Sequence, residues 1–156
     1  MTIMQIRNVV LAVFTMAIGL ANAQTKSAFN GTWKMDAAKS EFGSGPAPQS
    51  RTDRITYADP ALKDTITQNL GGNETTYDMN YTTDGKECDN KVRGNRVKST
   101  AKWEGEELVV DSKVFAMREA AMKDRWSVSA DGKTLTLLRH MTGAFNTDQK
   151  IVFERQ

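Results

Sequence analysis

Alternation of apolar and polar residues at every second position is the feature that most constrains the fold of this 156-residue chain. In the stretch FNGTWKM, one side of an extended backbone carries Phe29, Gly31, Trp33 and Met35. Similar short runs continue to the C-terminus, and Gly-Gly, Asp-Gly and Glu-Gly pairs separate several of them. The pattern predicts short antiparallel strands joined by hairpins, and it does not fit the strand–helix alternation of a parallel sheet.

We expect about eight or nine such strands, in sequential order, within a single domain at residues 29–156. The predicted fold class is all-β, an antiparallel up-and-down meander that closes into a barrel, because closure removes the exposed edges of the sheet. An open sandwich would show the same pattern.

Three segments interrupt the alternation. In DAAKSEF, Asp36 is expected to cap a short helical turn, and the following GSGPAP is expected to be an irregular crossing segment. Residues 117–121 are interpreted as a hairpin connection, with a helix at residues 116–124 as the alternative. Cys88 is placed in a polar turn, DGKECDN.

The N-terminal residues differ from the rest of the chain. Arg7 precedes an apolar run that ends in the small residues Ala21 and Ala23, and this order is typical of a secretory signal peptide. The apolar run is shorter than the roughly 20 residues that a membrane-spanning helix needs. We therefore expect a signal peptide at residues 1–23, a short disordered lead at residues 24–28, and export to the periplasm or the extracellular space.

Charge and reactive residues narrow the possible functions. Lys and Arg number 21 and Asp and Glu 19, so electrostatics gives no reason to expect nucleic acid or an anionic membrane as a partner. A single cysteine, Cys88, excludes an internal disulfide. His140, the only histidine, falls on the outward side of its strand without a ligand cluster, and no G-x-S-x-G or glycine-rich phosphate loop occurs. No metal, cofactor or enzymatic activity is expected, and the oligomeric state is left open.

The residues on the inward side of the strands are the candidates for a binding site. The barrel lining is predicted to include Trp33, Tyr77, Met79, Trp103, Trp126 and Arg139. Two carboxylates, Asp64 and Asp124, also fall on the inward side. Buried carboxylates need a hydrogen-bonding or cationic partner such as Arg139, and an ion pair of structural importance is the simplest interpretation.

FNGTWKM resembles the first strand of the calycins, the superfamily of lipocalins and fatty-acid-binding proteins, and IVFERQ resembles their last strand. Four further stretches, GTWKMDAAKSEF, GSGPAP, RWSVSADGKTLTLLRH and VFERQ, are similar to small secreted bacterial proteins that are lipocalin-like and of unassigned activity. The resemblance implies that Trp33 plugs the closed end of the barrel beneath a late arginine, either Arg139 or Arg155. The chain lacks the long helix and disulfide of lipocalins and the helical lid of fatty-acid-binding proteins.

Two functions follow from these expectations. The barrel binds a small apolar molecule at its open mouth, or it is a ligand-free structural or interaction module of the cell envelope that acts through its loops. The volume of the interior distinguishes them, because an apolar pocket of roughly 300 Å³ or more favours ligand binding and a much smaller one favours the packed module.

Overall fold

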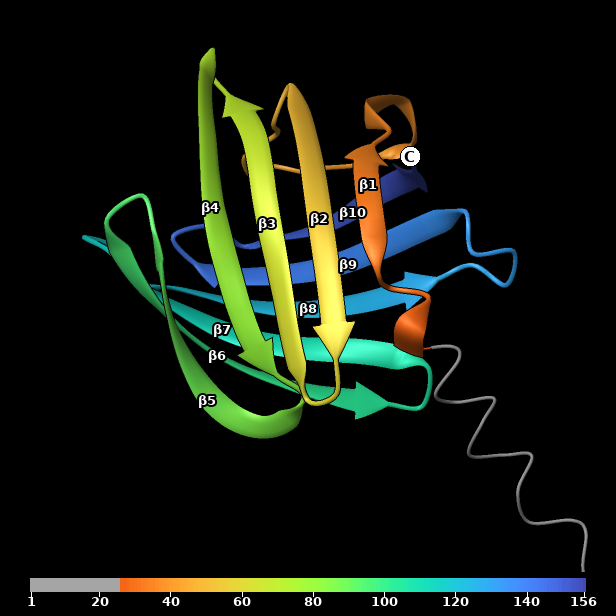
Figure 1. The fold of residues 1–156 in the computed structure, drawn as a ribbon. Coiled ribbons are helices and arrows are strands. Elements are labelled where there is room, and N and C mark those ends of the chain that lie inside the picture. Colours follow the sequence, from red (N-terminus) through yellow and green to blue (C-terminus); the bar gives the residue numbers. More distant parts are fainter. Residues whose placement is uncertain (1–25) are drawn as a thin grey trace, which may run out of the picture.

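A computed structural model describes residues 26–156, and the expected signal peptide at residues 1–23 lies outside the described residues. The described chain forms a ten-stranded antiparallel sheet (Figure 1). The strands are β1 (Gly31–Met35), β2 (Ser50–Ala58), β3 (Ala61–Leu70), β4 (Asn73–Thr82), β5 (Asp84–Val92), β6 (Asn95–Glu104), β7 (Glu107–Phe115), β8 (Ala120–Val128), β9 (Thr134–Gly143) and β10 (Thr147–Arg155).

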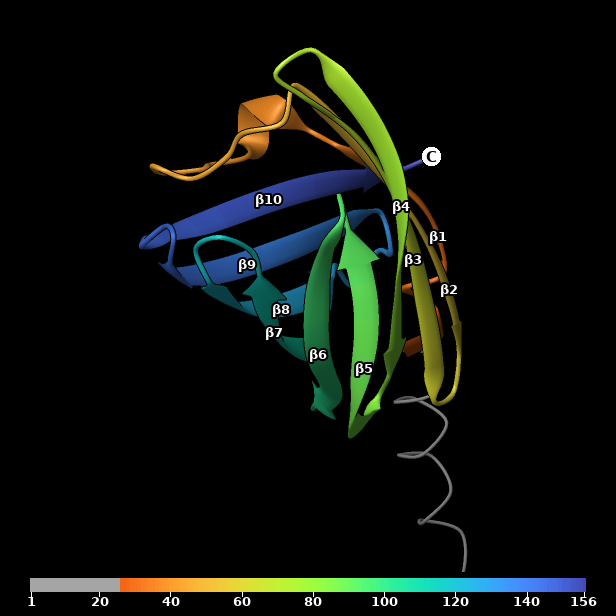
Figure 2. The ribbon, with the colours of Figure 1, turned by 90° about the vertical axis from the view of Figure 1, so that its left-hand side faces the viewer.

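The strand order is β4-β3-β2-β1-β10-β9-β8-β7-β6-β5, so strands that follow one another in the chain are neighbours except β4 and β5, and β1 also pairs with β10. In that pair the first and last strands lie antiparallel, with Trp33 opposite Arg155 and Met35 opposite Phe153. Figures 1 and 2 show β1–β4 crossing over β6–β10, so the sheet folds over onto itself and encloses its inward-facing side chains. The expected all-β meander and near-closure into a barrel are confirmed.

The strand count corrects the sequence-based expectation of eight or nine. The additional strand is β5, which contains the polar stretch DGKECDN that the sequence predicts to be a turn. Asn90 is the only buried residue of β5, so no apolar alternation marks this strand. Cys88 accordingly lies within a strand, half-buried, and not in a turn.

A seam separates β4 from β5, the two edges of the described sheet. No backbone ladder joins these strands in residues 26–156, although they are consecutive in the chain. Instead, the Asn80 amide donates to Asn90 Oδ1 (2.8 Å), and Asn90 Nδ2 donates to the Asn80 carbonyl (2.9 Å). The buried side-chain amide of Asn90 therefore satisfies one backbone position of β4 and closes the barrel at this point.

The closed end of the barrel is built around Trp33. The indole is fully buried and donates from Nε1 to the Phe29 carbonyl (2.9 Å). The guanidinium of Arg155 lies 4.1 Å from the centre of the Trp33 ring, a favourable cation–π distance. Arg155 is thus the arginine over the indole, and Arg139, the other candidate, lies elsewhere in the barrel.

Gly31 leaves the space that this arginine needs. A Cβ at Gly31 would lie 2.5 Å from Arg155 Nη1, and the backbone φ of +140° is one that side chains disfavour. The same guanidinium donates to three backbone carbonyls, those of Ala28, Asn30 and Gly132. Of the expected lead at residues 24–28, the described residues 26–28 belong to a short helical turn, with Asn30 N donating to Ser27 O (3.0 Å).

Two of the three interrupting segments follow the expected local rules. Asp36 accepts hydrogen bonds from the amides of Ala38 and Lys39 and caps the 3₁₀ turn η1 (Ala37–Lys39). The segment between β7 and β8 is a short connection followed by a strand, so the helical alternative is wrong.

Candidate functional site

A cavity of about 260 Å³ lies inside the barrel. Its apolar wall comes from inward-facing side chains of β3, β4, β6, β8, β9 and β10: Ile66, Met79, Val97, Met122, Met141 and Ile151. The wall includes three methionines, whose unbranched side chains adapt to irregular shapes. The volume lies slightly below the range of about 300–1,000 Å³ that is usual for small-molecule sites, so it suits a small ligand.

The mouth of this cavity lies at the end where β1, β3, β5, β7 and β9 finish. Its rim includes Pro46 and Pro48 of the crossing segment between β1 and β2, together with Leu70, Arg93 and Val114. Figure 2 shows this segment above β10. Buried Gln149 of β10 holds it there, because Nε2 donates to the carbonyls of Phe42 (3.1 Å) and Pro46 (3.2 Å).

Two buried ion pairs lie within the barrel, and three of their four residues line the cavity. On β2, Arg51 Nε and Nη2 each donate to one oxygen of Asp53, both at 2.7 Å. On the opposite wall, Arg139 of β9 makes the same two-pronged contact with Asp124 of β8, at 2.8 and 2.7 Å. The side chains of Arg51 and Asp53 are 4% and 1% exposed, and burial of such charges is tolerable only because they are paired.

These ion pairs decide the protonation of the arginines. Burial alone would lower the pKa of Arg139, but the Asp124 carboxylate outweighs it and raises the pKa above its ordinary value. The same balance, with Asp53 as the partner, raises the pKa of Arg51. Both guanidiniums therefore stay charged and bound to their carboxylates.

Several hydrogen-bond donors in the cavity wall have no partner in the described part of the chain. The indole Nε1 of Trp126 is buried and unpaired. The hydroxyls of Tyr77 and Tyr81 make no hydrogen bond with described residues, and Nη1 of Arg51 and of Arg139 is likewise unused. Among these groups Trp126 Nε1 is the buried one. An unpaired buried donor is costly in an empty protein, so this indole indicates a place for a bound acceptor.

Asp64 of β3 is fully buried beside this cluster, and neither of its oxygens has a hydrogen-bonding partner among residues 26–156. Burial and then the nearby Asp53 carboxylate raise the pKa of Asp64 well above its ordinary value, while Arg51 opposes them. The protonated acid is the form that this site favours, and it can share its proton with Asp53.

Four of the six lining residues predicted from the sequence line this cavity: Tyr77, Met79, Trp126 and Arg139. Trp33 does not, because it forms the floor at the closed end. Trp103 does not either, since its half-buried ring packs edge-on against Phe29 at 5.1 Å and its Nε1 donates to the Tyr57 hydroxyl (3.3 Å). At these two positions the structure differs from the expected lining.

Sequence reasoning missed Arg51, Asp53, Tyr81 and Gln149. A signal exists in part, because Arg51 and Asp53 share one side of β2 with the apolar residue Ile55, and all three are buried. Asp64 and Asp124, the two carboxylates predicted to face inward, are buried as expected. Arg139, expected as a partner for an inward carboxylate, pairs with Asp124, whereas Asp64 has no hydrogen-bonding partner among residues 26–156.

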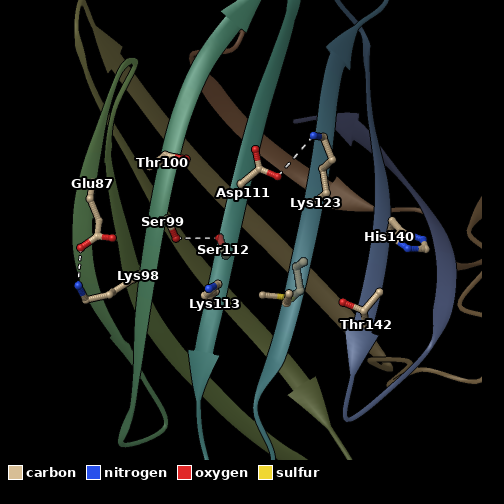
Figure 3. Close-up of a pocket in the computed structure, with 12 residues that line it drawn as sticks. Glu87, Lys98, Ser99, Thr100, Asp111, Ser112, Lys113, Lys123, His140 and Thr142 are labelled. Atoms are coloured by element: carbon tan, nitrogen blue, oxygen red, sulfur yellow. Dashed lines mark hydrogen bonds and ion pairs between the residues drawn. The ribbon is translucent and has the colours of Figure 1, made fainter.

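A second hollow, of about 350 Å³, lies on the outer face of the sheet (Figure 3). Its charged side chains pair across the strands, with Lys98 bound to Glu87 and Lys123 3.6 Å from Asp111. His140 lies at its edge, exposed, with Nδ1 2.7 Å from Asp148. A shallow surface of mixed and paired charge is typical of a solvated sheet face, and His140 is a surface residue as predicted.

No cluster of three or more His, Cys, Asp or Glu side chains suited to a metal ion occurs in residues 26–156. Within the same residues, no helix has the length and apolar character needed to cross a membrane.

Comparison with known proteins identifies the fold. No protein-family model and no curated protein match the chain. An abundant heat soluble (SAHS) protein of Ramazzottius varieornatus has a similar structure, with a TM-score of 0.62 and 13% identity over 83% of this chain and 96% of that one. Fatty-acid-binding protein 1 of Echinococcus granulosus gives a TM-score of 0.58 and 15% identity over 82% and 97% of the two chains.

A fatty-acid-binding protein of Schistosoma mansoni, solved in complex with arachidonic acid, gives a TM-score of 0.55 and 16% identity, covering 85% of this chain and 98% of that chain. At such identities the likeness establishes the fold alone. The chain shares the barrel fold of these fatty-acid-binding proteins.

Proposed function

We propose that this protein binds a small, largely apolar molecule inside its barrel. The observation that carries the proposal is the cavity of about 260 Å³, which joins a methionine-rich apolar wall to a buried donor without a partner, Trp126 Nε1. Fatty-acid-binding proteins with the same fold, one of them solved with arachidonic acid, support it. Transfer of apolar surface from water into the cavity supplies the affinity, and the donors orient the ligand.

Titration calorimetry with decanol tests this function. Decanol combines one hydroxyl with a short alkyl chain and therefore suits a small cavity. We expect saturable binding with one site per chain and a negative heat-capacity change, the signature of apolar burial. Absence of binding by decanol, decanoate and methyl decanoate alike would refute the proposed function.

A matched pair of variants on β8 locates the site. Met122 lines the cavity and Lys123, the next residue, points to the outer face. Met122→Trp should fill the interior and abolish decanol binding, whereas Lys123→Trp should leave it unchanged. Equal loss in both variants would place the binding outside the barrel.

Export of the mature barrel is part of the proposal and rests on the signal-peptide pattern of residues 1–23. N-terminal sequencing of the protein from its natural source should begin at Gln24. A mature chain that still carries Arg7 would contradict export by cleavage.

A second candidate function is contact with an envelope partner through the loops, without a ligand. The observation that favours it is the exposure of Phe115, Met117 and Phe145, all at or beside the β7–β8 and β9–β10 connections. These connections are neighbours, because Ala144 N donates to Glu119 O (3.2 Å). Cross-linked partners that persist after Met117→Ser and Phe145→Ser substitution would argue against this function.

A further inference from the structure

We infer that the cavity selects neutral ligands that carry an oxygen acceptor and discriminates against carboxylates, an inference that rests on the ligand-binding function proposed above. Two features support it: the cavity arginines are already bound to aspartates, and other hydrogen-bond donors in the cavity wall have no partner.

The first step concerns charge. Each cavity arginine is engaged by its own aspartate through two hydrogen bonds of 2.7–2.8 Å, and both aspartates are at least as buried as their partners. A ligand carboxylate that accepts from the unused Nη1 of Arg139, or that displaces Asp124, places two anions beside one guanidinium, so one of the two anions is buried without a counter-charge. Uncompensated buried charge is among the most unfavourable arrangements in proteins.

The second step concerns Asp64, whose protonation state sets the net charge of the barrel interior. Its oxygens are buried without partners, so its neutral form is the one compatible with the site. Two arginines, two paired aspartates and a neutral Asp64 sum to no net charge. The interior therefore offers no surplus positive charge to an anion.

The rim does not supply that charge either. Arg93 borders the mouth, but it is exposed to water and its Nη2 donates to Thr75 Oγ1 (3.3 Å). Solvent screens a charge in that position, so it affects the approach of a ligand more than the stability of the bound state.

The third step concerns the donors. Trp126 Nε1 can only donate a hydrogen bond, and so can the unused Nη1 groups of Arg51 and Arg139. The hydroxyls of Tyr77 and Tyr81 add two groups that donate or accept. A hydroxyl, ester, ketone or amide oxygen satisfies these donors without adding charge. A cationic ligand offers them no acceptor and faces two guanidiniums.

The wild-type protein provides the primary test. Calorimetric titrations with decanol, methyl decanoate, decanoate and decylammonium at neutral pH compare headgroups on one alkyl chain. We expect decanol or methyl decanoate to bind at least about tenfold more tightly than either ion. Decanoate binding as tight as that of decanol would overturn the selectivity while leaving the proposed ligand-binding function intact.

Two variants that each remove one negative charge extend the test. Asp124→Asn frees Arg139 and gives the interior one net positive charge, so decanoate should gain at least about tenfold in affinity relative to decanol. Asp111→Asn removes the same charge from the outer face of β7, where Asp111 faces Lys123, and should leave the ranking unchanged. An unchanged ranking in folded Asp124→Asn would refute the charge argument. If Asp124→Asn is partly unfolded, decanoate should raise its thermal midpoint more than decanol does. A larger rise with decanol would also refute the charge argument.

Discussion

Replacement of Trp33 by alanine tests the structural role assigned to the closed end of the barrel. The ring is fully buried, and truncation of such a side chain to alanine costs about 3–5 kcal/mol of unfolding free energy. Two further losses push the value towards the upper end of this range. The Phe29 carbonyl loses its 2.9 Å hydrogen bond, and Arg155 loses a cation–π contact worth about 0.5–2 kcal/mol.

Urea unfolding followed by circular dichroism measures this effect. Small domains have about 5–15 kcal/mol of total stability, so Trp33→Ala should remove a large share of it and lower the midpoint without changing the slope. Trp103→Ala is the matched control, because its ring is only half-buried and its loss should cost clearly less.

Binding provides the second readout for Trp33. The residue does not line the cavity, so decanol affinity measured well below the thermal midpoint should match that of the wild type. Unchanged stability together with lost binding would refute the plug assignment and make Trp33 a binding residue.

Three further substitutions test other features. The stability of Asp64→Asn relative to wild type should increase as pH rises from the unfolded carboxyl pKa, about 3.9, towards the raised pKa of folded Asp64. The wild type loses stability over this range, because its native state holds the Asp64 proton more tightly than the unfolded state does. A difference in urea midpoints that does not change with pH would contradict this prediction. Asn90→Ala should cost about 1–3 kcal/mol and accelerate hydrogen exchange at the Asn80 amide, which loses its acceptor; full protection of that amide would show that the seam does not depend on Asn90. Gly31→Ala should cost about 1–3 kcal/mol through backbone strain and contact with Arg155, and a wild-type thermal midpoint would contradict the close approach.

The alternation of the strands was sufficient to predict the meander, because inward positions with apolar side chains are visible in sequence. The floor was predictable as well, since Gly31 and Trp33 resemble the first strand of calycins. The strand β5 was not, because its one buried residue is Asn90, whose side chain replaces a backbone hydrogen-bonding partner. No propensity or periodicity marks a polar residue that serves this purpose.

The candidate site was predictable only where an unusual residue stood out on the inward side. Arg139 is recognisable as a partner for an inward carboxylate, but only the register of β8 and β9 shows that the carboxylate is that of Asp124 and not of Asp64. The pair Arg51 and Asp53 was missed, because two residues that neutralise each other within one strand look like an ordinary polar surface. Whether a cavity remains between such side chains depends on packing volume, which sequence alone does not specify.

Nuclear Overhauser effects between bound decanol and the methionine methyl groups test the central claim most directly. The methyl groups of Met79, Met122 and Met141 belong to residues that line the cavity, whereas Met117 is fully exposed on the β7–β8 connection. We predict contacts from the alkyl chain to the three interior methyl groups and none to Met117. Contacts to Met117 alone, or to no methionine at saturating decanol, would contradict a ligand site within the barrel.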